Sequence, residues 1–228
     1  MLKTNVLIPA ICSILIISAS CNHIAQASDL RMSEVEKNIE KQAETLRELG
    51  LSDISDEAIH LTQKASAPID PITLLIENAA SGDFDYDDVW TPSSSQIYCF
   101  DVQVNDIENM YSLFFQGITS INDNEFEISN VVEDMRNVDA GSGEGPRTVN
   151  FLYNGQEQLF IANDYYDWFD MKIIDFMNDL FEEKGNEKKL YFFCVEYEVC
   201  IVFYRTEAWA KEFEAKTGRE LRSSTNET

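Results

Sequence analysis

The stretch TVNFLYNGQEQLFIA, residues 148–162, decides the class of fold that we expect for this chain. Two segments rich in aliphatic, aromatic and β-branched residues, 148–153 and 156–162, flank the dipeptide Asn154-Gly155. Asn-Gly is the strongest short signal for a two-residue hairpin turn, because both turn positions need a positive φ. The stretch therefore predicts an antiparallel β-hairpin.

A second strand pair is predicted over residues 190–195 and 199–204. Both segments are apolar at successive positions, so both faces of the pair should be covered and the pair should be central in a sheet. Cys194 and Cys200 flank residues 196–198, and a loop of these three residues would place the two cysteines opposite each other, as a cross-strand disulfide requires. In one continuous strand they would instead be about 20 Å apart. The alternative to a disulfide is two buried, inert thiols.

Hydrophobic periodicity predicts further elements on both sides of these hairpins. We expect strands over 96–103 and 126–132, a glycine-rich loop over 139–146, and helices over 105–121, 167–185 and 207–216. The combination predicts an α+β fold with a mainly antiparallel sheet and helices on one face, preceded by a short helical arm.

The arm and the domain borders follow from composition. Helical patterns cover 28–49, 55–65 and 72–80, with Ser55 as the expected N-cap of the second. We predict a helical arm over 28–82, an acidic linker over 83–95, the α+β domain over 96–218 and a disordered tail over 219–228. The arm has too few large apolar residues to fold alone, so it either packs on the domain or acts as a spacer.

The first 27 residues have the pattern of a signal peptide. A short basic start at Lys3 is followed by an apolar run over 6–17 and by the small residues of Ala25-Gln26-Ala27, after which we expect cleavage. The segment Ser18-Ala19-Ser20-Cys21 offers a rival site, at which Cys21 would be lipidated and hold the protein at the envelope. An uncleaved anchor is the third alternative. We expect a secreted or extracytoplasmic protein with no membrane insertion after cleavage.

The charge of the chain limits its partners. The sequence has 17 basic and 41 acidic residues, a net charge of −24 at pH 7. Such a surface repels nucleic acid and anionic membranes, and it favours encounter with a cationic protein or peptide. The alternative is that the charge only keeps the protein soluble.

The candidate binding residues are Asp164, Tyr165, Tyr166, Asp167 and Trp168, where aromatic side chains alternate with carboxylates. Rings offer flat apolar faces and carboxylates accept hydrogen bonds, so the mixture suits sugars or cationic side chains. The structural alternative is that Asp167 caps the following helix while Trp168 and Phe169 fasten it to the sheet.

A weaker candidate is a calcium site at Asp83, Asp85 and Asp87. Their spacing is that of the first ligands of an EF-hand loop, but Asp88 stands where the loop needs glycine and Ser94 where it needs glutamate. We therefore expect no cofactor, and calcium is kept only as the alternative to a solvated linker.

The sequence contains none of the catalytic motifs that would indicate an enzyme class. The sequence has no phosphate loop, dinucleotide fingerprint, zinc helix or nucleophile elbow, and cleavage after Ala27 would leave His60 as the one histidine. We predict a non-enzymatic binding domain. A carboxylate-dependent hydrolase of an extracellular polymer and an envelope-anchored accessory lipoprotein are the alternatives.

Three segments carry a loose resemblance to known proteins: WTPS (90–93), NDIENMY (105–111) and KKLYFF (188–193). Over residues 90–218 the chain resembles uncharacterised bacterial exported α+β domains and the small proteins that serve as toxin immunity factors. The resemblance implies an architecture, and it assigns no chemistry and no functional residues. Export, charge and the missing catalytic motifs are what favour a binding domain, with an inhibitor or immunity factor for a cationic partner as one form of it.

Overall fold

The computed structural model describes residues 34–65, 70–80, 83–84, 90–91, 94–104, 106–139, 141–195 and 199–226. The predicted signal peptide and Cys21 lie outside these ranges. The helices are residues 34–48, α2 (Asp56–Lys64), α3 (Pro71–Ala80), α4 (Met110–Ser120, entered through the 3-10 turn Ile107–Asn109), α5 (Lys172–Glu183) and α6 (Glu207–Thr217). The strands are β1 (Asp83–Phe84), β2 (Trp90–Thr91), β3 (Tyr98–Asp101), β4 (Ile128–Asp134), β5 (Glu144–Tyr153), β6 (Gln156–Tyr165), β7 (Lys188–Val195) and β8 (Val199–Thr206).

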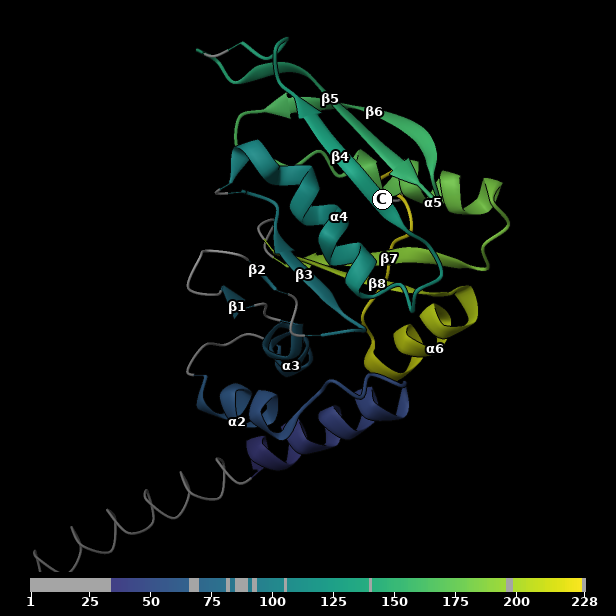
Figure 1. Cartoon of the computed structure of the whole chain (residues 1–228). Coiled ribbons are helices and arrows are strands. Elements are labelled where there is room, and N and C mark those ends of the chain that lie inside the picture. Colours follow the sequence, from purple (N-terminus) through teal and green to yellow (C-terminus); the bar gives the residue numbers. More distant parts are fainter. Residues whose placement is uncertain are drawn as a thin grey trace, which may run out of the picture.

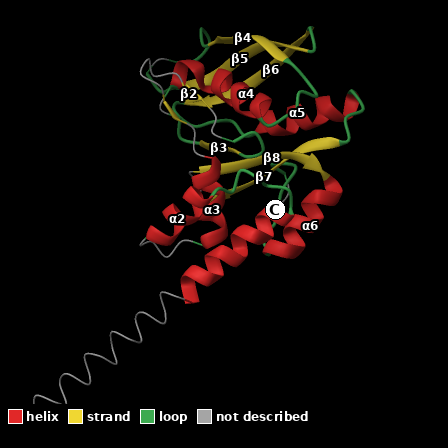
Figure 2. Ribbon diagram, turned by 60° about the horizontal axis from the view of Figure 1, so that its bottom comes forward, coloured by secondary structure: helices red, strands yellow, loops and turns green. Residues whose placement is uncertain are grey.

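The strands form two antiparallel three-stranded sheets, in the orders β4-β5-β6 and β3-β8-β7, beside the short pair β1-β2. Figure 2 shows their layers: the β4-β5-β6 sheet, then α4 and α5, then the β3-β8-β7 sheet, then α2, α3 and α6. The α+β class and the antiparallel pairing are confirmed. The expected single sheet is replaced by two, and helices cover both faces of β3-β8-β7.

The β7-β8 hairpin explains this layering. Along β8, Cys200, Val202 and Tyr204 enter the core shared with α4 and α5, while Ile201 and Phe203 enter the core shared with the N-terminal helices. Successive residues of a strand point to opposite faces, so a strand that is apolar at every position needs a cover on each side. The expected central position holds for β8, which lies between β3 and β7.

The N-terminal helices pack on the β3-β8-β7 sheet. Leu46 and Leu75 are fully buried in one core with Phe203 and Phe213. The indole Nε1 of Trp209 in α6 donates a hydrogen bond of 2.7 Å to the carbonyl of Leu49. Of the two roles considered for the arm, the structure shows the packed one; Figure 1 shows α2 and α3 below the sheet.

The segment after α6, where the sequence predicts a disordered tail, lies against β7 in the described structure. Arg222 pairs with Phe192 of β7 through two backbone hydrogen bonds of 2.8 and 2.9 Å, and Leu221 is buried. The amide of Asn178 in α5 donates to the carbonyl of Ser223 at 2.8 Å. The unpaired backbone groups along the outer side of β7 give this polar segment its partners.

The Asn154-Gly155 hairpin has the predicted turn. Asn154 and Gly155 have φ values of 48° and 76°, and Tyr153 lies opposite Gln156. The strands extend beyond the predicted segments, because Glu144 to Pro146, expected in a loop, pair with residues 163–165. Among the described helices, none combines the length and the apolar character that crossing a bilayer requires.

Candidate binding surface

The predicted binding residues lie where β6 ends and the chain turns toward α5. Tyr166 and Trp168 are exposed, with 59% and 42% of their surface accessible. Tyr165 and Asp164 pair through their backbones with Glu144 and Gly145 of β5, and their side chains lie outside the described structure. The surface therefore sits at the end of the long β5-β6 hairpin.

Asp167 joins this turn to the loop that follows β3. Its carboxylate Oδ2 accepts a hydrogen bond of 2.8 Å from Nε2 of Gln103, and its carbonyl accepts one of 2.7 Å from the amide of Val104. Gln103 also forms a β-bridge with Trp168, and its amide donates to Oδ1 of Asp101 at 2.8 Å. Two carboxylates and an exposed indole thus come from segments more than sixty residues apart in the sequence.

Tyr166 has an unusual backbone conformation. Its φ is 69°, a left-handed value that is costly for a bulky residue. Its amide donates to the carbonyl of Gly143 at 2.8 Å. A Cβ at Gly143 would lie 2.5 Å from the Tyr166 ring, so the loop needs glycine there. Residues held in such conformations gather at functional sites, where surrounding contacts compensate for the strain.

The loop beneath Tyr166 adds a third carboxylate. Oδ1 of Asp139 accepts hydrogen bonds from the amides of Gly141 and Ser142 at 3.0 and 2.7 Å. These donors, with Ser142 contributing most, hold the pKa of Asp139 below its ordinary value. Asp139 is therefore ionised at neutral pH, and its carbonyl accepts the amide of Gly143, the residue that bonds Tyr166.

Phe169 and Asp170 fasten the turn to the core and to the start of α5. The buried Phe169 ring packs on Phe100, Tyr111 and Phe114 at centroid distances of 4.9 to 5.1 Å. Asp170 accepts the amides of Lys172, at the start of α5, and of Asn163. The alternative prediction, in which Asp167 caps the helix while Trp168 and Phe169 pack on the sheet, holds only for Phe169. Asp170, not Asp167, bonds the first residue of α5, and Trp168 remains exposed.

A buried ion pair holds the support together. Arg147 is fully buried, and its Nη1 lies 2.9 Å from Oε2 of Glu133 and 2.6 Å from the carbonyl of Ile107. The other oxygen of Glu133 accepts hydrogen bonds from the amides of Tyr111 and Ser112 and from the Ser112 hydroxyl, at 2.8 to 3.0 Å. Glu133 thereby satisfies free donors in the first turn of α4.

Sequence reasoning missed this pair, although a signal existed. Arg147 precedes Val149, Phe151 and Tyr153 at steps of two, so the predicted hairpin places it on the core face. Burial raises the pKa of Glu133, while the hydrogen bonds from Ser112 and the Arg147 charge oppose the rise. Glu77, the other carboxyl group in the described chain with a raised pKa, lies in α3, in a different layer.

The remaining predicted sites have separate outcomes. Cys194 and Cys200 lie directly opposite each other as free thiols, with 2.7 Å between their sulfur atoms. Cys99, whose pKa burial raises to about 12, packs toward the other face of the sheet. Asp83 pairs through its backbone with Thr91, whereas Asp85 and Asp87 fall outside the described residues. Within the described chain, no group of three or more metal-ligating side chains occurs.

We use the name acidic aromatic surface for Asp101, Gln103, Asp139, Tyr166, Asp167 and Trp168. None of its three carboxylates forms an ion pair with a basic residue that the structure describes. Their charge is therefore available to a ligand, next to two exposed rings. Comparison of the chain with models of protein families, with curated proteins and with solved structures gives no match.

Proposed function

We propose that this chain is an exported, non-enzymatic binding protein whose acidic aromatic surface recognises a cationic protein or peptide. The observation that carries the proposal is the exposure of Tyr166 and Trp168 on either side of Asp167, in a turn that Gln103 links to Asp101 and Gly143 links to Asp139. The partner's lysine or arginine side chains would pair with these carboxylates and stack on the rings. An inhibitor or immunity factor for a basic protein would act in this way.

Two physical arguments support this choice. A cation over an exposed aromatic ring contributes about 0.5–1 kcal/mol, and a turn whose backbone is already held by hydrogen bonds loses less conformational entropy on binding than a free loop. The net charge of −24 adds long-range attraction that speeds the encounter with a basic partner. The strained backbone of Tyr166 is also easier to explain if its exposed ring contacts a ligand.

The test is affinity capture from the secreted and envelope fractions of the native host, at low and at high salt, with the purified protein as bait. We expect a basic protein or peptide that binds at low salt and is released at high salt, because salt screens interactions between exposed charges. Trp168→Ala and Tyr166→Ala should each reduce its recovery.

The matched control is Leu61→Ala. Leu61 is 45% exposed on α2, in the layer of N-terminal helices, and its truncation removes a similar fraction of exposed apolar side chain. Recovery with this variant should equal that with the unchanged protein. Equal recovery with all three variants, or no specific capture at either salt, would contradict the proposal.

A further inference from the structure

The edges of the two three-stranded sheets differ in how they are protected. Free backbone groups along an edge can pair with another chain, and proteins usually prevent this with short strands, bulges, charged residues or covering segments. Here β3 has only four residues. β4 contains an irregularity between Ser129 and Val132, with Asn130 at a φ of 52°. β7 is covered by Arg222.

The fourth edge strand, β6, is neither short nor bulged, and no described segment pairs with its outer side over residues 157–161. Its charged residues, Glu157 and Asp164, are both acidic. It has ten residues, pairs with β5 without a register shift, and contains no proline, lysine or arginine. Figure 1 shows it as a long strand at the side of the upper sheet. Unlike the other three edges, β6 therefore offers free backbone groups with which another strand can pair.

The direction of its backbone groups follows from the hairpin turn. In a two-residue turn the flanking residues, Tyr153 and Gln156, exchange hydrogen bonds, so the even-numbered residues of β6 bond to β5. The odd-numbered residues point away from β5, as shown by the amide of Asn163, which donates to Asp170 instead. The outward backbone groups of Glu157, Leu159 and Ile161 form no hydrogen bond to another residue of the described chain.

The side chains of the same residues lie on the open face of the sheet. Leu159 and Ile161 have 51% and 60% of their surface exposed, while Phe160 and Ala162 between and beside them are buried. An added strand would therefore gain backbone hydrogen bonds from these residues and apolar contact with two of their side chains.

We propose that the outer edge of β6 is a docking strand, and that a basic, extended segment of the partner pairs with it as a fourth strand of the β4-β5-β6 sheet. This inference rests on the proposed function for the partner's charge. β6 leads directly into Tyr166, Asp167 and Trp168, so one extended segment spans both the edge and the acidic aromatic surface.

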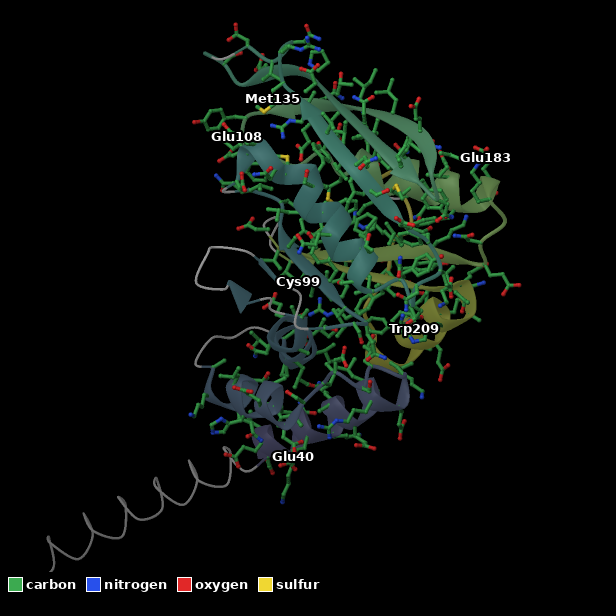
Figure 3. The ribbon with its side chains drawn as sticks, viewed as in Figure 1. Glu40, Cys99, Glu108, Met135, Glu183 and Trp209 are labelled. Carbon is green, nitrogen blue, oxygen red and sulfur yellow. The ribbon has the colours of Figure 1, made fainter. Side chains whose placement is uncertain are left out.

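The charges near β6 favour a basic segment over a second copy of this chain. Glu157 lies on the strand, and Glu183 lies where α5 ends beside the hairpin turn, as Figure 3 shows. Lys184 fixes this placement through hydrogen bonds from its Nζ to Gln156 at 3.0 Å and to Glu183 at 3.5 Å. Two copies, each with a net charge of −24, would repel each other across the edge.

The direct test uses a synthetic ten-residue peptide that alternates lysine with valine. Its binding to the purified protein is followed by calorimetry, and amide hydrogen exchange is read at Glu157, Leu159 and Ile161. We expect exchange at these three amides to slow by about tenfold or more at saturation, because each outward group gains a partner. A peptide with the same side chains and N-methylated backbone amides keeps its charge and should bind at least about tenfold more weakly.

Two substitutions separate the edge from the open face of the sheet. Leu159→Lys places a lysine on β6, and lysine is a residue that protects natural sheet edges from pairing. The affinity of the protein for the lysine-valine peptide should fall about tenfold. Val132→Lys is the control, since Val132 is 58% exposed on the same face, on β4, opposite Asn150 of the central strand. It should leave the affinity unchanged.

Equal weakening by both substitutions would show that the peptide covers the face, and it would overturn the docking strand. Equal binding by the N-methylated peptide would do the same. Peptide binding that requires Trp168 while the β6 amides stay unprotected would overturn the inference and leave the proposed function standing. Protected β6 amides with no effect of Trp168→Ala on peptide binding would support the docking strand and contradict the proposed function of the acidic aromatic surface. Self-association of the protein through β6, with no peptide bound, would also overturn it.

Discussion

Substitution of Arg147 by methionine tests the support beneath the acidic aromatic surface. The change removes the buried guanidinium that lies 2.9 Å from Glu133 and 2.6 Å from the carbonyl of Ile107. It also removes the cation above the Tyr111 ring, 5.7 Å from its centroid. Methionine is apolar and flexible enough to occupy much of the same space. The variant therefore isolates the loss of charge from a large loss of volume.

The expected magnitude follows from the burial of the pair. Arg147 and Glu133 have side chains that are 0% and 4% exposed, and removing one member of a buried ion pair costs about 3–5 kcal/mol, because the other charge loses its compensation. Glu133 keeps its hydrogen bonds from Tyr111 and Ser112. We therefore expect a loss of about 3 kcal/mol in the free energy of unfolding at neutral pH, at the lower end of that range.

The loss should depend on pH in a defined direction. Burial already raises the folded-state pKa of Glu133 above its ordinary value of 4.5, and loss of Arg147 should raise it further. A carboxyl group with a raised folded-state pKa favours folding at low pH, and this contribution is lost as the pH rises through that pKa. The variant should therefore lose less stability at about pH 5 than at about pH 8.

Urea unfolding of the variant and the unchanged protein at both pH values measures this difference. The double variant Glu133→Gln/Arg147→Met removes both charges, and we expect it to be more stable than Arg147→Met at about pH 8. A loss that is equal at both pH values, or a double variant that is no more stable than the single one, would refute the reasoning.

Three further predictions concern the cysteines, the strained turn and the arm. Under oxidising conditions Cys194 and Cys200 should form a disulfide, found by mass spectrometry of the unreduced protein, and oxidation should stabilise the unchanged protein, but not Cys200→Ser, by about 2 kcal/mol; an equal effect of oxidation on both proteins would contradict this. Tyr166→Asn should keep or raise the melting temperature, because asparagine tolerates a positive φ, while it weakens partner capture; a marked fall in melting temperature would show that the ring supports the fold. Leu46→Ala should cost about 2–5 kcal/mol, and calorimetry should still show one unfolding transition because the arm and sheet share a core; a separate early transition would show that the arm unfolds independently.

The sequence alone determined the elements whose signals are local. The hairpin of β5 and β6 formed where Asn154-Gly155 predicted it, because the turn requires two residues that accept a positive φ. Ser55 accepts the amide of Ala58 at 3.1 Å and caps α2 as expected. The apolar pattern at successive positions of β8 also predicted, correctly, that both of its faces would be buried.

The tertiary structure alone decided which distant segments meet. Strand periodicity states which face a residue occupies, but it does not name the neighbouring strand, so the pairing of β3 with β8 and the division into two sheets could not be deduced. The same limit applies to the surface: the sequence offered Tyr166, Asp167 and Trp168, whereas Gln103 and Gly143 joined them only through long-range hydrogen bonds of side chains and backbone. The contact of Arg222 with Phe192 was equally hidden from the sequence, because the free backbone edge of β7 is a partner that exists only after the sheet has formed.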